Sequence, residues 1–219
     1  MGARPASQAD LLCNPNNPTG LYLTEKEVCP LLEACVEAGG LLVVDEAYIN
    51  FVESAWASVA LLKSGHLVLL HSMTKDYALA GLRLGYLLVP AEVIEVLSKV
   101  QPPWSVNAVA QETGVAALAS EGHYRDAWRK LRGLTQVLRR SLLELGLEAF
   151  PTDANFLLIR IGDVARAREE LWAHHILVRD CASFELPAYI RVGARLEEDN
   201  RRLVSCLKRF LESAFLWAN

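Results

Sequence analysis

The sequence lacks long apolar runs, paired cysteine motifs and any marked excess of one charge. No uncharged apolar stretch approaches the roughly 20 residues that a membrane-spanning helix needs, so we expect no membrane segment. The net charge is −4 with both signs interspersed, which argues against a nucleic-acid surface. The five cysteines include no Cys-x-x-Cys pair and are odd in number, so we expect reduced thiols in a cytoplasmic protein.

Signatures of other ligand classes are missing too. The run Gly81-Leu82-Arg83-Leu84-Gly85 lacks the Gly-x-Gly-x-x-Gly spacing of a dinucleotide site. His174 and His175 are adjacent, so they point in different directions on a helix and are poorly placed to bind one ion. We therefore expect no metal. Residues 1–10 contain charges and no apolar core, so we do not expect a signal peptide there.

The order of apolar runs predicts an α/β protein. The chain has 219 residues, 52% of them hydrophobic, enough for one large core or two modest ones. Residues 41–44 are all apolar, as in a parallel strand covered on both faces. Further strands are expected at 67–70 and 82–89, a short helix at 56–63, and a helix beginning at the capping box of Thr24 and Glu27. We predict a partial large domain with a mostly parallel sheet over residues 1–120, a long linking helix over 121–146, and a small α+β domain over 147–219.

Chemistry-bearing residues follow the predicted strands. Lys75 comes after the strand 67–70, and its amine can form an imine with an aldehyde and later move a proton. Asp45 ends the strand 41–44, where a carboxylate can pair with a pyridinium nitrogen. Tyr48 and Asn17, the latter in a rigid Asn/Pro-rich loop, can donate to a phenolic oxygen.

Anion-binding candidates complete the set. Ser72 and Arg83 offer a hydroxyl and a guanidinium fork for a phosphate. Arg191 lies in a predicted strand, where an inward arginine is costly unless it meets an anion such as a substrate carboxylate. Each residue also has an ordinary alternative: Asp45 as a turn residue, Tyr48 as a packed aromatic, Arg191 on an exposed strand edge. Taken together, they predict an enzyme site for pyridoxal 5′-phosphate (PLP).

Four motifs occur in an order that resembles the fold-type I PLP-dependent aminotransferases of class I and II. They are Asn16-Asn17-Pro18-Thr19-Gly20, Asp45-Glu46-Ala47-Tyr48, Ser72-Met73-Thr74-Lys75 and Gly81-Leu82-Arg83-Leu84-Gly85-Tyr86. Within that family, residues 101–107 and 178–184 are similar to the branch of histidinol-phosphate aminotransferase and threonine-phosphate decarboxylase. The resemblance runs from about Leu11 onward, and it implies an aspartate aminotransferase-like fold.

The resemblance also implies a role for each candidate residue. Lys75 would be the Schiff-base lysine and Asp45 the partner of the ring nitrogen, with Tyr48 and Asn17 on the ring oxygen. Ser72 and Arg83 would bind the phosphate. Arg191, with Asn17, would bind the substrate, its guanidinium on the carboxylate.

The resemblance implies amino transfer between histidinol phosphate and 2-oxoglutarate in a homodimer that handles small molecules. A decarboxylase acting on threonine phosphate shares every motif and stays open as an alternative, as does a truncated, non-catalytic module. The family's large domain begins upstream of the Asn/Pro-rich loop, with a Gly/Ser-rich helix start that residues 1–10 do not match. We therefore expect the 219 residues alone to bind PLP weakly, to turn over little or no substrate, and either to aggregate or to depend on a partner chain.

Overall fold

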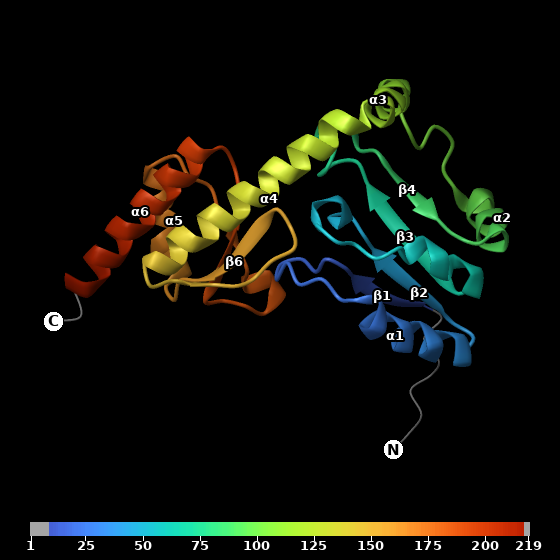
Figure 1. The fold of residues 1–219 in the computed structure, drawn as a ribbon, viewed down its shortest axis with the longest axis horizontal. Coiled ribbons are helices and arrows are strands. Elements are labelled where there is room, and N and C mark those ends of the chain that lie inside the picture. Colours follow the sequence, from blue (N-terminus) through green and yellow to red (C-terminus); the bar gives the residue numbers. More distant parts are fainter. Residues whose placement is uncertain (1–8, 217–219) are drawn as a thin grey trace, which may run out of the picture. The chain divides into compact units, whose positions relative to one another are not determined.

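A computed structural model describes residues 9–216, which form two compact units (Figure 1). Within this range, the first unit comprises residues 9–16 and 22–128, and the second comprises residues 17–21 and 129–216. Because the short segment 17–21 belongs to the second unit, the division is not a simple cut along the sequence. The domain limits predicted above stay a prediction.

The sheet of the first unit is mostly parallel, as predicted. Its four strands are β1 (Ala9–Cys13), β2 (Leu41–Asp45), β3 (Leu67–Ser72) and β4 (Gly85–Leu88), in that spatial order. The first three strands are parallel and β4 is antiparallel to β3. Cys13 lies opposite Asp45, and Asp45 lies opposite Leu70. The carboxyl ends of the three parallel strands therefore lie along one edge of the sheet, the edge at which α/β proteins bind ligands.

Helix α1 (Glu25–Glu37) forms where the capping box was expected. The backbone N–H and the hydroxyl of Thr24 both donate to Oε2 of Glu27, at 2.8 and 2.7 Å. The helix buries Val28 and Leu32 in a core shared with β2 and β3. Burying a side chain of this kind stabilises the folded state by about 1.5–3 kcal/mol, so the sheet and α1 support each other.

Three short 3₁₀ helices connect the elements: η1 (Ile49–Phe51), η2 (Ser58–Ser64) and η3 (Ala80–Leu82). The short helix expected at 56–63 is present as the 3₁₀ helix η2. One expectation needs correction here. The strand expected from residue 82 begins only at Gly85, because Arg83, which directly follows η3, has a left-handed φ of 59° that breaks the extended backbone.

Helices complete the first unit and lead into the second. They are α2 (Ala91–Val100), α3 (Ala108–Ala119) and α4 (Glu121–Glu144).

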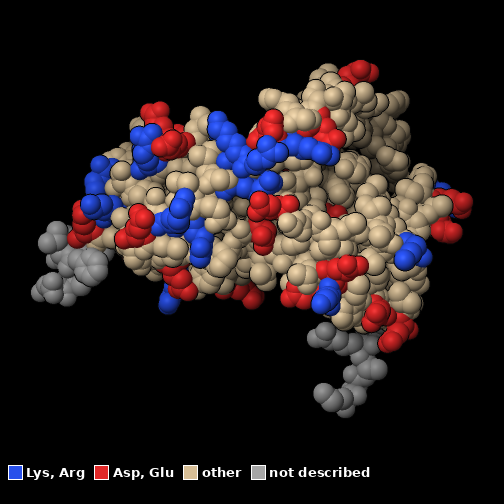
Figure 2. Space-filling view, viewed as in Figure 1, with Lys and Arg blue, Asp and Glu red and all other residues tan. Residues whose placement is uncertain are grey.

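The face in Figure 2 carries Lys and Arg side chains among Asp and Glu side chains, as the interspersed charges of the sequence predict. No helix among residues 9–216 is long and apolar enough to cross a membrane.

The second unit is a small antiparallel sheet packed against helices. The sheet has the order β5 (Glu148–Ala149), β6 (Phe156–Arg160), β8 (Tyr189–Gly193) and β7 (Arg179–Asp180). Each of three helices follows one strand along the chain. Helix α5 (Val164–Ala173) follows β6, the 3₁₀ helix η4 (Ala182–Phe184) follows β7, and α6 (Glu197–Leu216) follows β8. Leu142, Leu157, Leu171 and Leu207 are all fully buried in one core, which joins the end of α4 to β6, α5 and α6.

Candidate active site

Asp45 is the last residue of β2, and its carboxylate is held by the turn that follows. Oδ1 accepts a hydrogen bond from the backbone N–H of Ala47 at 2.9 Å. The backbone carbonyl of Asp45 accepts from the N–H of Asn14 at 2.9 Å, which ties the ends of β1 and β2 together. The side chain is half-buried. The strand end thus presents an oriented carboxylate, which can pair with a cation.

Asn14 closes the Asn/Pro-rich loop, a role that the sequence did not reveal. Its side chain is fully buried. Nδ2 donates to the carbonyl of Leu23 at 3.1 Å, and the N–H of Leu23 donates to Oδ1 at 2.7 Å. The only sequence signal was an Asn directly after an apolar strand, which by itself indicates a turn.

Lys75 lies in a tight turn after β3, and its side chain is exposed. The N–H of Met73 donates to the carbonyl of Leu84 at 3.1 Å, and the N–H of Leu79 donates to the carbonyl of Met73 at 3.1 Å. The N–H of Ala78 donates to the carbonyl of Lys75 at 3.3 Å. The backbone around the lysine is therefore fixed on both sides, while the amine remains accessible to a small molecule.

One phosphate candidate, Ser72, ends β3, and the other, Arg83, lies in the turn just before the neighbouring strand β4. Ser72 pairs with Gly85, which follows Arg83 by two residues. The Ser72 Oγ lies 2.7 Å from the Oγ1 of Thr74 and accepts from the Thr74 N–H at 3.3 Å. The exposed Arg83 guanidinium donates to the carbonyl of Ala80 at 2.9 Å. Hydroxyl groups and a guanidinium are the donor types that a phosphate dianion prefers, so these residues fit such a group.

Gly85 allows β4 to approach β3 closely beside Ser72. A Cβ atom at this position would lie 2.8 Å from the backbone carbonyl oxygen of His71, closer than side chains tolerate. The second glycine of the Gly-Leu-Arg-Leu-Gly motif, Gly85, is therefore explained by the close packing of the two strands.

Tyr48 is buried and lies just before η1. Its ring packs against that of Phe51, with the ring centroids 6.4 Å apart and tilted by 39°. Asp45 and Tyr48 lie on one continuous turn, so the carboxylate and the phenol belong to the same strand end.

A buried polar pair next to these strand ends was not predicted. Oε2 of the buried Glu46 lies 2.9 Å from Nε2 of His71, and the two residues directly adjoin Asp45 and Ser72. Tyr86 stacks on His71 at 5.0 Å between ring centroids, and burial raises the pKa of the Tyr86 phenol. Glu46 belongs to the Asp45-Glu46-Ala47-Tyr48 motif, but nothing in the sequence pairs it with His71, because the register of β2 and β3 brings the two together.

In the second unit, the structure brings Asn17 and Arg191 together. A guanidinium N–H of Arg191 donates to the side-chain oxygen of Asn17. The same guanidinium lies 4.9 Å from the ring centre of Phe156, a cation–π distance. Arg191 is therefore half-buried on β8, the strand between β6 and β7, and it is not an exposed edge residue.

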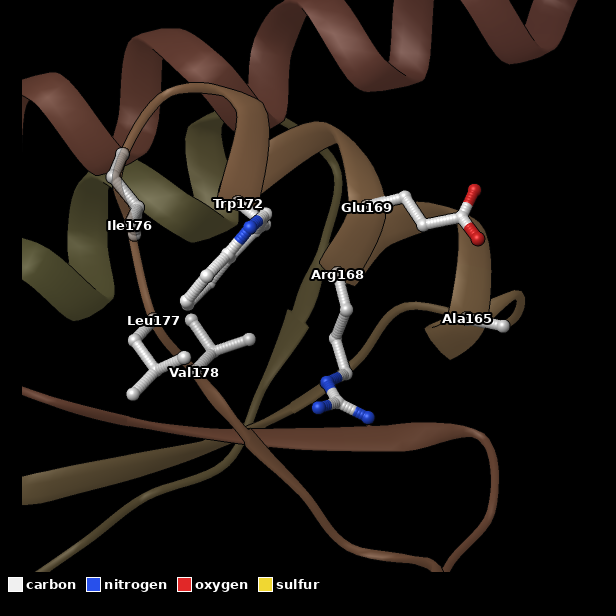
Figure 3. A pocket seen from close by; sticks show the side chains of 7 residues that line it. All are labelled: Ala165, Arg168, Glu169, Trp172, Ile176, Leu177 and Val178. Carbon is white, nitrogen blue, oxygen red and sulfur yellow. The ribbon is translucent and has the colours of Figure 1, made fainter.

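A separate cavity of about 310 Å³ opens between α5 and residues 176–178 of the second unit (Figure 3). Trp172, Leu177 and Val178 form an apolar wall, and Arg168 approaches from the other side, 3.3 Å from Asp180. The predicted site residues do not line this cavity.

Within residues 9–216, no three His, Cys, Asp or Glu side chains are placed to hold a metal. No disulfide joins the five cysteines, all of which lie in this range.

The mixed, mostly parallel sheet defines an α/β protein, and the polar residues lie at its carboxyl edge, where proteins of this class bind ligands. The particular family follows from comparison with known proteins. The family model of class I and II aminotransferases matches residues 4–207, and the chain belongs to this family.

Individual relatives agree with that assignment. A histidinol-phosphate aminotransferase of Symbiobacterium thermophilum is 38% identical over 202 residues, which cover 91% of this chain and 56% of that protein. The crystal structure of histidinol-phosphate aminotransferase from Sinorhizobium meliloti in complex with pyridoxal-5′-phosphate matches with a TM-score of 0.86 and 25% identity, covering 95% of this chain and 58% of that one. L-threonine-O-3-phosphate decarboxylase from Porphyromonas gingivalis matches with a TM-score of 0.84 and 28% identity, covering 94% and 65%.

The comparisons confirm the predicted fold class and the predicted resemblance. The chain spans about half the length of the curated relatives it matches. The roles assigned to Asn17, Asp45, Tyr48, Ser72, Lys75, Arg83 and Arg191 stay predictions.

Proposed function

We propose that the protein is a PLP-dependent aminotransferase that moves an amino group from histidinol phosphate to 2-oxoglutarate. The observation that carries this proposal is that an accessible lysine and an oriented carboxylate both lie at the ends of neighbouring parallel strands, in a member of this family. The curated relatives named histidinol-phosphate aminotransferase support the choice of substrate.

The residues of the first unit would hold the cofactor. When bound, PLP supplies a protonated ring that stabilises negative charge on the substrate. Asp45 would keep the ring nitrogen protonated, and Tyr48 would donate to the ring oxygen. Ser72 and Arg83 would bind the phosphate, and the Lys75 amine would hold the aldehyde and then transfer a proton.

The residues of the second unit would act on the ring oxygen and the substrate. The Asn17 amide would donate to the ring oxygen through its nitrogen, because its oxygen already accepts from Arg191. Arg191 has a planar guanidinium with donors beyond the one used on Asn17, so it can still bind a substrate carboxylate.

A decarboxylase acting on threonine phosphate is the second candidate. The fold match to the P. gingivalis decarboxylase, at 28% identity, supports this second candidate. The two reactions differ in which bond to the substrate Cα is broken, and the same lysine, carboxylate and anion-binding residues serve both.

We further propose a cytoplasmic homodimer with a role in histidine biosynthesis. Helix α2 has no buried residue, and Val96, Val100 and the nearby Trp104 are 61%, 73% and 96% exposed. Exposed apolar side chains gathered in one region are typical of an interface. The cysteines without disulfides are in keeping with a reducing compartment.

Incubation of the protein with PLP, histidinol phosphate and 2-oxoglutarate tests the proposal. Glutamate is expected to form in proportion to the histidinol phosphate consumed, and a Lys75→Arg variant is expected to form none. Release of carbon dioxide from threonine phosphate without glutamate formation would favour the second candidate. A protein that catalyses neither reaction, alone or with a partner chain, would contradict both.

A further inference from the structure

Asn50 and Asp76 join the two loops that carry the predicted catalytic groups. Asn50 lies in η1, two residues after Tyr48, and Asp76 directly follows Lys75. The Nδ2 of Asn50 donates to Oδ2 of Asp76 at 2.5 Å, across 26 positions of sequence. One hydrogen bond thus connects the segment after β2 to the turn after β3.

The backbone of Asp76 is held from a third element. The indole Nε1 of Trp128, in α4, donates to the Asp76 carbonyl at 2.7 Å. The ring of Tyr77 packs edge-on against the Trp128 ring, with the centroids 5.5 Å apart at 89°, and contacts Tyr124 at 4.8 Å. Tyr77 and Trp128 are both buried. The aromatic cluster therefore clamps the chain immediately after the exposed lysine.

Burying the Asp76 carboxylate is costly, which argues that its contacts matter. Removal from water raises its pKa, and the hydrogen bonds from Asn50 and from the Tyr77 N–H at 2.9 Å act in the opposite direction. An apolar residue would avoid this cost if the turn needed packing alone. The carboxylate instead bonds both its own turn and the neighbouring loop.

We propose that Asn50 and Asp76 are positioning residues that hold the Lys75 turn in place relative to the loop of Asp45 and Tyr48. Trp128 acts with them by fixing the Asp76 backbone. The inference rests on the proposed function, because it assigns these residues to the lysine that would hold PLP. None of the three needs to touch the cofactor: the effect passes through the backbone of the turn.

The test measures how PLP binds to Asn50→Ala and Asp76→Ala, with Asp76→Asn as the conservative control. In Asp76→Asn the single amide oxygen can still accept from Asn50, so the bond between the loops is retained, while the Tyr77 N–H loses its acceptor. Absorbance titration gives the PLP affinity, and borohydride trapping with peptide mapping gives the fraction of bound PLP fixed to Lys75 at saturation.

Both alanine variants lose the hydrogen bond between Asn50 and the Asp76 carboxylate, which holds the Lys75 turn in place. They are therefore expected to bind PLP at least about tenfold more weakly. They are also expected to show a smaller fraction fixed to Lys75 at saturating PLP, whereas Asp76→Asn stays near the unsubstituted protein in both. A purely structural role in a folded variant would leave the trapped fraction unchanged. If Asp76→Ala does not fold, Asn50→Ala decides, because it removes the same bond from a half-buried position.

Two failures are distinguishable. If the unsubstituted protein is trapped at Lys75 and the folded alanine variants match it in affinity and trapped fraction, the positioning inference is overturned while the proposed function stands. If the unsubstituted protein is not trapped at Lys75, the proposed function is overturned, and the inference with it.

Discussion

Arg191 donates a hydrogen bond to the side-chain oxygen of Asn17, although 174 positions separate the two residues. The acceptor is a neutral amide and not a carboxylate, so this hydrogen bond places no negative charge beside the guanidinium. Phe156 lies under the guanidinium plane and limits its motion. An oriented, half-buried cation of this kind is suited to bind a carboxylate.

Arg191→Ala is expected to raise the apparent KM for 2-oxoglutarate by roughly 10- to 100-fold, with a smaller effect on kcat. The reason is the loss of a charge-assisted hydrogen bond to the substrate. Arg179→Ala is the matched control, because Arg179 lies opposite Arg191 on β7 but is exposed and bonded to Ser183. Steady-state kinetics on both variants check this, and an unchanged KM in Arg191→Ala would refute the role.

Asp45→Asn is expected to lower kcat by at least ~10²-fold while PLP stays bound. The amide oxygen can still accept from Ala47, so the turn is retained while the charge opposite the ring nitrogen is lost. Asp10→Asn on the neighbouring strand serves as the control. Single-turnover kinetics with bound PLP measured by absorbance provide the test, and near-normal turnover in Asp45→Asn would rule out this assignment.

Asp76→Asn is expected to raise the melting temperature at pH 7 and to have little effect below about pH 4. Burial raises the pKa of Asp76, so the folded state binds this proton more tightly than the unfolded state does. The contribution to stability is fully present below the unfolded pKa and is lost as the pH rises through the folded pKa. Thermal unfolding across this range checks the sign, and a difference independent of pH would contradict it.

Gly20→Ala is expected to destabilise the second unit. Gly20 has a φ of +75°, and an added Cβ would lie 2.0 Å from Oγ1 of Thr152. Left-handed backbone costs about 1–2 kcal/mol for other residues, and the clash adds roughly 1–3 kcal/mol. Gly39→Ala isolates the backbone cost, because Gly39 also has a positive φ but has no atom within 4 Å of the added Cβ. Equal losses of unfolding free energy in the two variants would show that the clash is relieved without cost.

The sequence predicted the strand ends well, because apolar parallel strands and the polar residues after them are visible without a structure. Asp45 ends β2 as expected, and β3 runs two residues past the predicted 67–70, so that Ser72 is its last residue. Local turn geometry was harder to predict. The left-handed Arg83 shortened the predicted strand, and the two-residue strands β5 and β7 are too short to leave a periodic pattern.

The contacts that hold the site together were not predictable from spacing. Asn50 and Asp76 meet because β2 and β3 are neighbours in the sheet, and the same register brings Glu46 to His71. Each of these residues by itself is an ordinary polar residue in a loop or strand. Their pairing depends on the tertiary arrangement, which a single sequence does not encode in any local signal.

The site of PLP attachment tests the central claim most directly. After incubation with saturating PLP and reduction with borohydride, peptide mapping is expected to place the label on Lys75, and Lys75→Arg is expected to lose it. Lys63→Arg and Lys99→Arg are matched controls that should keep the label. A label on Lys63 or Lys99, or a label that survives in Lys75→Arg, would contradict the account.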